Sequence, residues 1–268
     1  MIPVTGATRF IVMLGDPIAQ VKTPTVFQEW AAANGQDIIM VPMRVSSADL
    51  SVTLQAIRGW ANCCGAVITY PHKQAAAAAV DHASRAVRMV GACNVIRREP
   101  DGRLSGDITD GAGFVAALRS NGFDPLGKDI HLIGAGGAGS AIAFALLEAG
   151  TARLVLRDQR PKQAETLFSE LKELFPKVPV LTELPDNFNC ALICNATPVG
   201  MGGDAAHPWP LETLPQSCLV ADIVPDPPMT AWLIAAEKCG HKVQTGPDMV
   251  KAQLPAVVGY ILNHSQQT

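Results

Sequence analysis

Short apolar runs alternate with helix-like segments along the chain, and this alternation restricts the fold more than any other feature of the sequence. The apolar runs with strand character cover residues 10–14, 38–41, 66–69, 130–133, 154–156, 191–194 and 219–223. The helix-like segments cover residues 25–34, 48–60, 74–87, 113–121, 138–149, 162–174 and 229–239. Strands that alternate with helices are typical of α/β domains with mostly parallel sheets. We therefore expect an α/β fold.

A turn-rich connection at residues 121–127 indicates that this fold is divided into two domains. A new block of strands and helices starts after it, so we expect a domain boundary near the helix that follows Asp110. From Gly246 onward the chain has an apolar helical pattern that can return to the first domain. The length of 268 residues also favours two domains over one.

The composition predicts a globular, soluble enzyme. Apolar residues make up 48% of the chain and charged residues 17%, which is enough apolar surface to form a core. The net charge of −3 argues against broad binding of nucleic acid or of an anionic membrane. We expect no nucleic-acid or membrane partner, and the sequence leaves a homo-oligomer open.

The pattern of cysteines and of apolar stretches predicts a cytoplasmic protein. The sequence shows no basic segment followed by an apolar leader core, and no apolar stretch long enough to span a bilayer. Its seven cysteines are scattered and form neither a zinc-like pair nor a disulfide framework. We therefore expect reduced, buried thiols and no metal site.

A glycine-rich turn follows the apolar run at residues 130–133 and precedes a helix-like segment. The turn has the GxGxxG pattern and consists of Gly134, Ala135, Gly136, Gly137, Ala138 and Gly139. In a dinucleotide-binding turn the first glycine allows the tight bend, the second lets the pyrophosphate approach, and the third allows close helix–strand packing. The amino end of the helix then favours phosphate. The alternative is a packing turn without a ligand.

An acidic residue after the next strand favours NAD as the cofactor. Asp158 lies 19 residues after Gly139, where a carboxylate can accept hydrogen bonds from the adenosine ribose. Arg157 and Arg160 flank it, and arginine in this loop can instead hold a 2′-phosphate. We expect NAD rather than NADP because Asp158 occupies the position of the fingerprint itself.

Six collinear motifs make the chain resemble the shikimate/quinate dehydrogenase family. They are residues 15–24 (GDPIAQVKTP, similar to GNPIxHSxSP), 67–73 (VITYPHK, similar to NVTxPxK), 91–94 (GACN), 106–111 (GDITDG, similar to GxNTDG), 195–197 (NAT) and Gln253. The resemblance implies a substrate-binding αβ domain at residues 1–110, completed by C-terminal helices at 245–268. A Rossmann-like NAD(P)-binding domain at 111–244 is inserted between these parts, and the active site lies in the cleft.

The resemblance implies a dehydrogenase that oxidises a ring hydroxyl of shikimate or of a similar cyclic hydroxy acid. Such a reaction needs a group that takes the hydroxyl proton as hydride leaves. The family's lysine matches Lys73 and its aspartate matches Asp110, so we expect them to be the general acid/base and its partner. Taken alone, Lys73 reads as a solvated residue at a helix start. Asp110 alone reads as a helix N-cap.

The resemblance also assigns binding residues. The positions that match substrate-binding residues of the family are Val21, Thr23, Thr69, Asn94 and Gln253. Besides the glycine-rich turn, Arg157 and Asp158, the positions that match cofactor-binding residues are Asn195, Thr197, Ile223 and Gly246. Asn195 reads equally well as a residue that stabilises a turn. We expect His72 and His131 to be structural, because neither is paired with a nucleophile or with metal-ligand spacing.

The chain departs from the family pattern where the substrate carboxylate is held. Val21 replaces one of two serines while Thr23 keeps a hydroxyl, Pro225 replaces a tyrosine, and Val67 and Ile108 replace asparagines. Each lost hydrogen bond to a carboxylate is worth roughly 1.5–3 kcal/mol. We therefore expect weak activity on shikimate and weaker activity on quinate. The alternatives are a catalytically silent ligand-binding protein, a dehydrogenase of an aminated shikimate analogue, and a Rossmann dehydrogenase of another substrate class.

Overall fold

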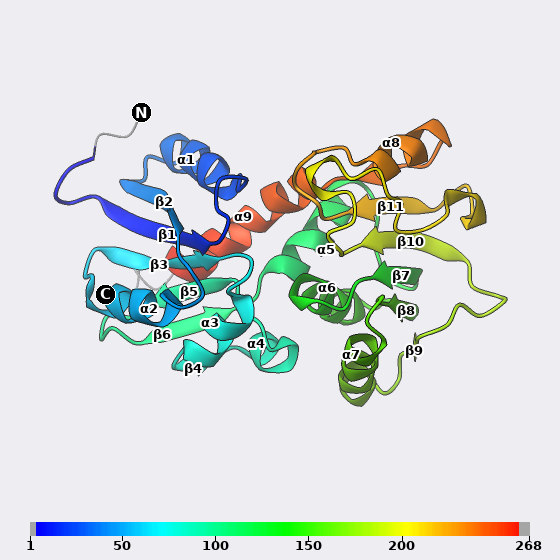
Figure 1. The fold of residues 1–268 in the computed structure, drawn as a ribbon, viewed down its shortest axis with the longest axis horizontal. Coiled ribbons are helices and arrows are strands. Elements are labelled where there is room, and N and C mark those ends of the chain that lie inside the picture. Colours follow the sequence, from blue (N-terminus) through cyan, green and yellow to red (C-terminus); the bar gives the residue numbers. More distant parts are fainter. Residues whose placement is uncertain (1–3, 263–268) are drawn as a thin grey trace. The chain divides into compact units, whose positions relative to one another are not determined.

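The chain forms two compact units in the computed structural model, which describes residues 4–262 (Figure 1). The first unit comprises residues 1–109 and 254–268, and the second comprises residues 110–253. The prediction of an α/β fold is confirmed. All seven predicted strands are present within one to three residues of their expected ends. The domain boundaries drawn from the sequence stay a prediction.

The first unit is built around a mixed six-stranded sheet in the order β2-β1-β3-β5-β6-β4. Its pairings are parallel except for β3–β5 and β5–β6. The sequence did not predict β5 and β6, which form a hairpin closed by a turn in which the Gly102 amide donates to the Glu99 carbonyl. The elements of this unit are β1 (Arg9–Gly15), α1 (Thr23–Ala33), β2 (Ile38–Arg44), α2 (Leu50–Gly59), β3 (Cys63–Ile68), α3 (Lys73–Ala79), β4 (His82–Ala83), α4 (Arg85–Val90), β5 (Val95–Arg98) and β6 (Leu104–Asp107).

The expectation of a single helix at residues 74–87 is wrong, because this segment forms two short helices, α3 and α4, with the short strand β4 between them. The carboxylate of Asp81 accepts a hydrogen bond from the Leu104 amide and pairs with Arg58, which draws the chain onto the sheet. The Ser84 hydroxyl then accepts from the Val87 amide and starts α4 as an N-cap. Apolar residues at helical spacing therefore belong here to two short helices.

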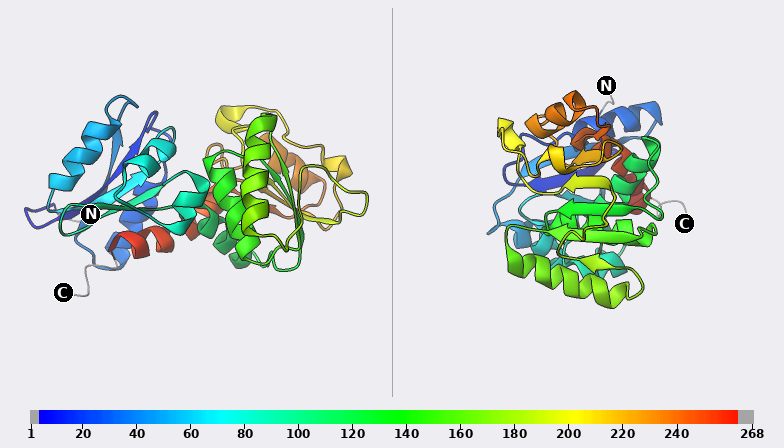
Figure 2. Two further views of the ribbon diagram at one scale, coloured as in Figure 1. Left: turned by 90° about the horizontal axis from the view of Figure 1, so that it is seen from below. Right: turned by 90° about the vertical axis from the view of Figure 1, so that its right-hand side faces the viewer.

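The end of the chain packs into the first unit. Leu254, Val257 and Ile261 from the last helix, α9 (Gly246–Leu262), share a buried cluster with Phe27 of α1 and with Ile11 of β1. The helices α1 and α9 lie on one face of the sheet and α2 lies on the other (Figure 2). One C-terminal helix, rather than several, completes the fold of this unit within residues 4–262.

The second unit is built around an all-parallel six-stranded sheet in the order β12-β11-β10-β7-β8-β9. Helices α5, α6 and α7 bury apolar residues against one face, and α8 covers the other (Figure 2). The elements are α5 (Asp110–Ser120), β7 (Asp129–Ile133), α6 (Gly137–Glu148), β8 (Arg153–Arg157), α7 (Pro161–Leu174), β9 (Val180–Leu181), β10 (Cys190–Asn195), the 3₁₀ turns Met201–Gly203 and Leu211–Thr213, β11 (Leu219–Asp222), α8 (Ala231–Lys238) and β12 (Val243–Gln244).

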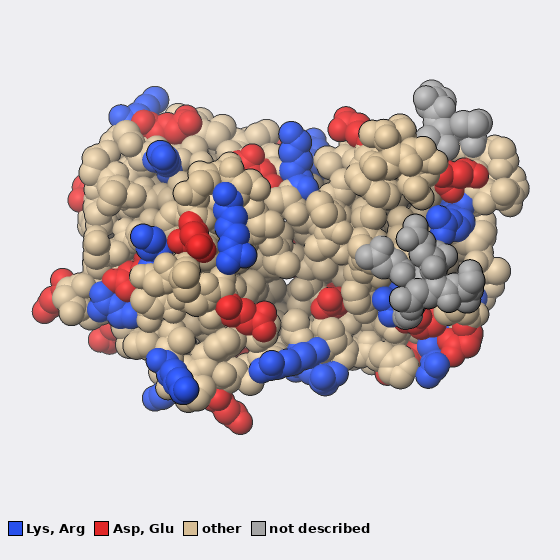
Figure 3. Space-filling view, turned by 180° about the vertical axis from the view of Figure 1, so that it is seen from behind, with Lys and Arg blue, Asp and Glu red and all other residues tan. Residues whose placement is uncertain are grey.

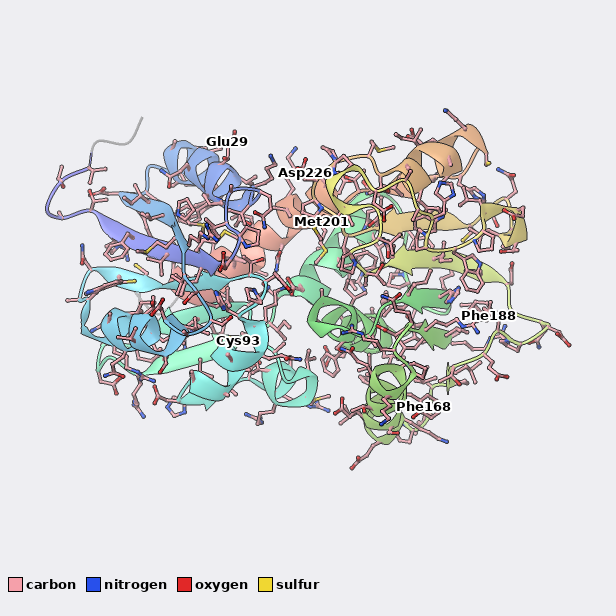
Figure 4. All side chains as sticks on the ribbon, viewed as in Figure 1. Glu29, Cys93, Phe168, Phe188, Met201 and Asp226 are labelled. Atoms are coloured by element: carbon pink, nitrogen blue, oxygen red, sulfur yellow. The ribbon has the colours of Figure 1, made fainter. Side chains whose placement is uncertain are left out.

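The cysteines are all free thiols, and most of them lie in the core. Burial raises the pKa of Cys63 to about 11 and that of Cys93, labelled in Figure 4, to about 12. Thiols in such surroundings are poor nucleophiles. The expectation of seven buried thiols is wrong at Cys239, which is exposed at the C-cap of α8, and at Cys64, which is only half-buried.

The surface carries mixed charge. Figure 3 shows Lys, Arg, Asp and Glu side chains interspersed among uncharged atoms on one face of the molecule. Among the helices of residues 4–262, none combines the length and the apolar character that crossing a bilayer requires. In the same residues, no group of three or more His, Cys, Asp and Glu side chains is arranged to hold a metal ion.

Candidate functional site

The glycine-rich turn lies at the carboxyl edge of the parallel sheet in the second unit, between β7 and α6. Gly134 has a φ of +112°, and its amide donates to the Arg157 carbonyl at the end of β8, 2.7 Å away. A Cβ on Gly139 would lie 2.1 Å from the Gly134 carbonyl oxygen. The first and last glycines are therefore required by the protein's own backbone, as a dinucleotide turn predicts.

The middle of this turn is open. Gly136 is the N-cap of α6, and a Cβ placed on it would meet no atom within 4 Å. The amides of the first helical turn begin at Gly137 and Ala138, where the helix has its positive end. A half-buried backbone with open space beside it, next to a helix N-terminus, fits the pyrophosphate of a dinucleotide.

Asp158 is not available to a ribose in this structure. One carboxylate oxygen accepts from the Ala135 amide at 2.8 Å, and the other accepts from the Arg160 amide at 2.8 Å. Burial alone would raise the pKa of Asp158, but these hydrogen bonds and the nearby Arg160 guanidinium hold it below the ordinary value. Its side chain is 3% exposed. Asp158 therefore shapes the glycine-rich turn from inside.

The two arginines beside Asp158 are in different situations. Arg160 is paired with Asp158, with 3.4 Å between Nε and the carboxylate. Arg157 is exposed, and its guanidinium lies over the ring of Trp209, 5.5 Å from the ring centroid. Within residues 4–262 the Arg157 guanidinium has no carboxylate partner. Its N–H donors can therefore bind an anion at this edge of the sheet.

Asn195 is engaged in the turn after β10. Its amide nitrogen donates to the Val199 carbonyl and to the Asp222 carboxylate, and its amide oxygen accepts from the amide and hydroxyl of Thr197. Asn195 and Thr197 therefore form one hydrogen-bonded turn, which agrees with the structural reading of Asn195. The Ile223 amide joins this edge by donating to the Asn195 carbonyl.

None of the sequence motifs includes Asp222, the buried carboxylate that holds these loops together. Asp222 ends β11 and accepts hydrogen bonds from Asn195 Nδ2, from the Val224 amide and from the Thr230 hydroxyl. The loop from Met201 also meets the loop after β11, where the Gly202 amide donates to the Asp226 carbonyl (Figure 4). An acidic residue that ends an apolar run was the one clue in the sequence.

Replacing Asp222 by asparagine is expected to remove a pH dependence of stability. Burial raises the pKa of Asp222 to about 6, against the hydrogen bonds that lower it. The folded chain therefore keeps a proton that the unfolded chain loses, and this contribution to stability falls as the pH rises from about 4 to about 6. The full pKa change corresponds to about 3 kcal/mol.

Denaturant unfolding of both forms between pH 4 and 7 measures this effect. The free energy of unfolding of Asp222→Asn, relative to the wild type, should rise over that interval and level off above it. Asparagine keeps the acceptor for Asn195 and for the Val224 amide. A difference between the two proteins that does not vary with pH would contradict the prediction.

Asp110 and Gln253, predicted from separate motifs, meet in the second unit. The Gln253 amide nitrogen donates to a carboxylate oxygen of Asp110 at 3.0 Å. Asp110 is buried at the first residue of α5, where the positive end of the helix stabilises a carboxylate. The carboxylate is therefore held in one orientation by the helix end and by α9.

In the first unit, Thr69 follows the carboxyl end of β3, and Asn94 precedes β5, which runs antiparallel to β3. Asn94 is buried; its side-chain oxygen accepts from the Thr109 amide at 2.8 Å, and its carbonyl accepts from the Ile68 amide at the end of β3. Thr69 follows β3, and its amide donates to the Leu14 carbonyl. These bonds fix the strand ends that precede Lys73 and Asp110.

Lys73 is half-buried at the first residue of α3. Its carbonyl accepts from the Cys93 amide, so its backbone is tied to the loop before Asn94. His72, just before it, is buried and its Nε2 lies 2.7 Å from the Val45 carbonyl. His72 therefore ties the start of α3 to the backbone at Val45, in agreement with the expectation that it is a structural residue.

Val21 and Thr23 lie at the start of α1. Thr23 is its first residue and is half-buried, while Val21 packs partly against the apolar cluster that contains Ile11 and Phe27. Gly246 opens α9, where a Cβ would lie 2.2 Å from the Val224 carbonyl oxygen. The close approach that requires glycine at 246 is therefore to the protein's own backbone.

Comparison with known proteins assigns the family. A family model described as the shikimate dehydrogenase substrate binding domain matches residues 13–96. A curated shikimate dehydrogenase (NADP(+)) from Moorella thermoacetica is 34% identical over 260 residues, which covers 94% of this chain and 88% of that protein. The chain belongs to the shikimate dehydrogenase family.

Solved structures agree with this assignment to the shikimate dehydrogenase family. The crystal structure of shikimate 5-dehydrogenase from Thermus thermophilus in complex with NADP(H) and shikimate superimposes with a TM-score of 0.85 at 30% identity, covering 96% of this chain and 94% of that chain. The ligand-free 5-ketofructose reductase of a Gluconobacter species gives 0.84 at 27% identity, covering 96% and 93%. The protein is therefore an oxidoreductase that acts on a CH–OH group, with a Rossmann-like second unit.

The expectation of NAD as the cofactor is wrong. The curated relatives at 30–34% identity are named NADP(+)-dependent shikimate dehydrogenases. The physical reason lies in Asp158, whose side chain is only 3% exposed and whose two carboxylate oxygens already accept from the Ala135 and Arg160 amides. The buried carboxylate of Asp158 therefore does not bind the ribose hydroxyls of NAD, and it does not repel the 2′-phosphate of NADP. Arg157, next to it in sequence, is exposed.

Proposed function

We propose that this protein oxidises a ring hydroxyl of a shikimate-like cyclic hydroxy acid to the ketone, with NADP as the hydride acceptor. The observation that carries the proposal is full-length similarity to shikimate dehydrogenases combined with Lys73 and Asp110 at the matching motif positions. Spectrophotometric detection of NADPH formation with a panel of hydroxy-cyclohexene acids tests it. A complete absence of turnover would favour a catalytically silent member of the family.

We propose distinct roles for the two residues. In the oxidation, the amine of Lys73 takes the hydroxyl proton while the carbon-bound hydrogen leaves as hydride. The carboxylate of Asp110, oriented by Gln253, binds the reacting or neighbouring hydroxyl, as its match to the family's aspartate implies. In the reverse direction the charged lysine returns the proton to the ketone oxygen. The cofactor supplies only the site that accepts or returns the hydride.

Arg157 and Arg160 are proposed to bind the 2′-phosphate of NADP. The open backbone at Gly136 and the exposed Arg157 guanidinium fit the pyrophosphate and the 2′-phosphate respectively. We expect kcat/KM to be higher with NADP than with NAD. Initial rates with each cofactor at saturating substrate measure this ratio, and a clear preference for NAD would contradict the assignment.

Shikimate itself is expected to be a weak substrate, because Val21 and Pro225 supply no side-chain hydrogen-bond donor for its carboxylate. Two lost charged hydrogen bonds weaken binding by about 10²-fold or more. Restoring one donor with Val21→Ser should lower the KM for shikimate by about tenfold. Val26→Ser, which places the same hydroxyl elsewhere in the same apolar cluster, is the matched control.

Steady-state kinetics of the wild type and of the two variants measure these effects. A KM for shikimate in the low micromolar range in the wild type would contradict the expected weakness. An equal response of Val21→Ser and Val26→Ser would show that the hydroxyl at position 21 does not face the substrate. Quinate, which carries an additional hydroxyl, should be used less well than shikimate.

A second candidate substrate class is a neutral keto-sugar. Because Val21 and Pro225 supply no donor for a substrate carboxylate, a substrate without a carboxylate would lose no hydrogen bond there. In addition, a protein named 5-ketofructose reductase shares the fold over 96% of this chain. Oxidation of NADPH by 5-ketofructose, compared with that by 3-dehydroshikimate, separates the two classes. An aminated shikimate analogue belongs in the same panel.

A further inference from the structure

Trp209 places an aromatic ring beside the end of β8, next to the glycine-rich turn. The residue lies in the loop between the 3₁₀ turns, far along the chain from β8, yet the Arg157 guanidinium lies over its ring at 5.5 Å from the centroid. None of the motifs that assign the family includes Trp209. Its role is therefore not explained by the resemblance to the family.

Trp209 is held rigidly from three sides. Its indole N–H donates to the Thr213 hydroxyl at 2.9 Å, and its carbonyl accepts from the indole N–H of Trp232 at 2.9 Å. The ring of buried His131 in β7 meets it edge-on, with 4.5 Å between centroids. Since the orientation of the Trp209 ring is fixed by these neighbours, a cation packed on its face loses much of its freedom.

His131, which meets the Trp209 ring edge-on, carries no charge that would attract or repel the Arg157 guanidinium. Burial, together with the positive charge of Arg157, lowers the pKa of His131 to about 4, so the imidazole is neutral at neutral pH. Arg157 also sits next to the turn, because its carbonyl accepts from the Gly134 amide and it pairs in register with Ile133. The backbone of Arg157 is therefore joined to the glycine-rich turn, while its guanidinium is exposed and lies over the Trp209 ring.

The same strand carries a second arginine–aromatic pair that serves as an internal comparison. At the other end of β8, the guanidinium of Arg153 lies over the ring of Phe188, 5.4 Å from its centroid; Phe188 is labelled in Figure 4. Arg153 is already committed, since its guanidinium pairs with the Asp129 carboxylate and donates to Asn187. Arg157 has an aromatic neighbour, Trp209, but no carboxylate partner among residues 4–262. Its N–H donors therefore remain available to an anionic ligand.

We propose that Trp209 is a positioning residue for NADP specificity, which holds the Arg157 guanidinium in place to bind the 2′-phosphate of the cofactor. The proposal rests on the NADP assignment made above and goes beyond it. It requires that Trp209 act on the cofactor through Arg157 alone. The affinity for NAD, which lacks the 2′-phosphate, should therefore not depend on Trp209.

Calorimetric titration of NADP and NAD into the purified protein tests the proposal. Trp209→Leu should weaken NADP binding by about three- to tenfold, with NAD binding and kcat unchanged, and Trp209→Phe should recover part of the loss. Arg157→Ala should weaken NADP binding by about tenfold or more. In the Arg157→Ala background, Trp209→Leu should have no further effect. Phe188→Leu, which removes the comparison pair at the other end of β8, should leave both cofactors unaffected.

Each result is decisive. Equal weakening of NADP and NAD by Trp209→Leu, or a further loss in the Arg157→Ala background, would overturn the positioning role. If Trp209→Leu does not fold, Trp209→Phe carries the same comparison, and an equal effect on both cofactors there would have the same meaning. A wild-type protein that binds NAD more tightly than NADP would instead overturn the cofactor assignment, so the two failures are distinguishable.

Discussion

Replacing Lys73 by alanine is expected to lower kcat by about 10²-fold or more, with little change in the KM for NADP. A positioned general acid/base contributes about this factor to a proton transfer, and solvent replaces it poorly. The variant keeps the backbone hydrogen bond from the Cys93 amide to the carbonyl of residue 73, so α3 keeps its start. Initial rates with NADP at saturating substrate measure the effect.

Two controls show whether the lysine acts in the chemical step. Gln74→Ala changes the next residue of the same helix and should leave kcat unchanged. Asp110→Asn retains an oxygen for Gln253 Nε2, and should still lower kcat. If the two residues work as a pair, the double variant should be little worse than Lys73→Ala. A kcat in Lys73→Ala within about twofold of wild type would remove Lys73 from the mechanism.

Replacing Gly139 by alanine is expected to destabilise the second unit by about 1–3 kcal/mol or more. The new Cβ would lie 2.1 Å from the Gly134 carbonyl oxygen, which is backbone and cannot move aside without opening the turn. The melting temperature should fall by several degrees. Calorimetric or spectroscopic thermal unfolding of the variant measures the loss.

Gly136→Ala is the matched control in the same turn. Its Cβ would meet nothing within 4 Å and its φ of −76° suits alanine, so stability should change by less than about 1 kcal/mol. Its cofactor affinity should nevertheless fall, because the methyl group would occupy the surface that the pyrophosphate is proposed to approach. Equal losses of stability in the two variants would contradict this division between a packing glycine and a ligand-facing glycine.

Much of the second unit could be predicted because its determinants are local. A strand, a glycine turn and a helix follow one another within residues 130–149, and each is specified by its own residues and their neighbours. Prediction was poorer in the first unit. The strand β5 also pairs with β3, and the short strand β4 pairs with β6, so these strands depend on partners distant along the chain, which local propensity does not reveal.

The site shows the same division. The sequence placed Asp158 at the fingerprint position, but the partner that decides its role is the Ala135 amide on another element. The pairing of Asp110 with Gln253 joins residues 143 positions apart, and no local pattern expresses it. Asp222 escaped notice because its importance comes from burial and from donors on two other segments.

The sequence by itself determined the α/β class, the dinucleotide turn, the family and the residues matched to its chemistry, because these depend on residue types at fixed short spacings. Only the tertiary structure decided which polar groups remain available to a ligand. The Asp158 carboxylate is turned inward, while the Arg157 guanidinium lies over the Trp209 ring, and we propose that the choice of cofactor depends on this difference. A side chain's hydrogen-bond capacity is set by what the fold brings against it, which spacing along the chain does not express.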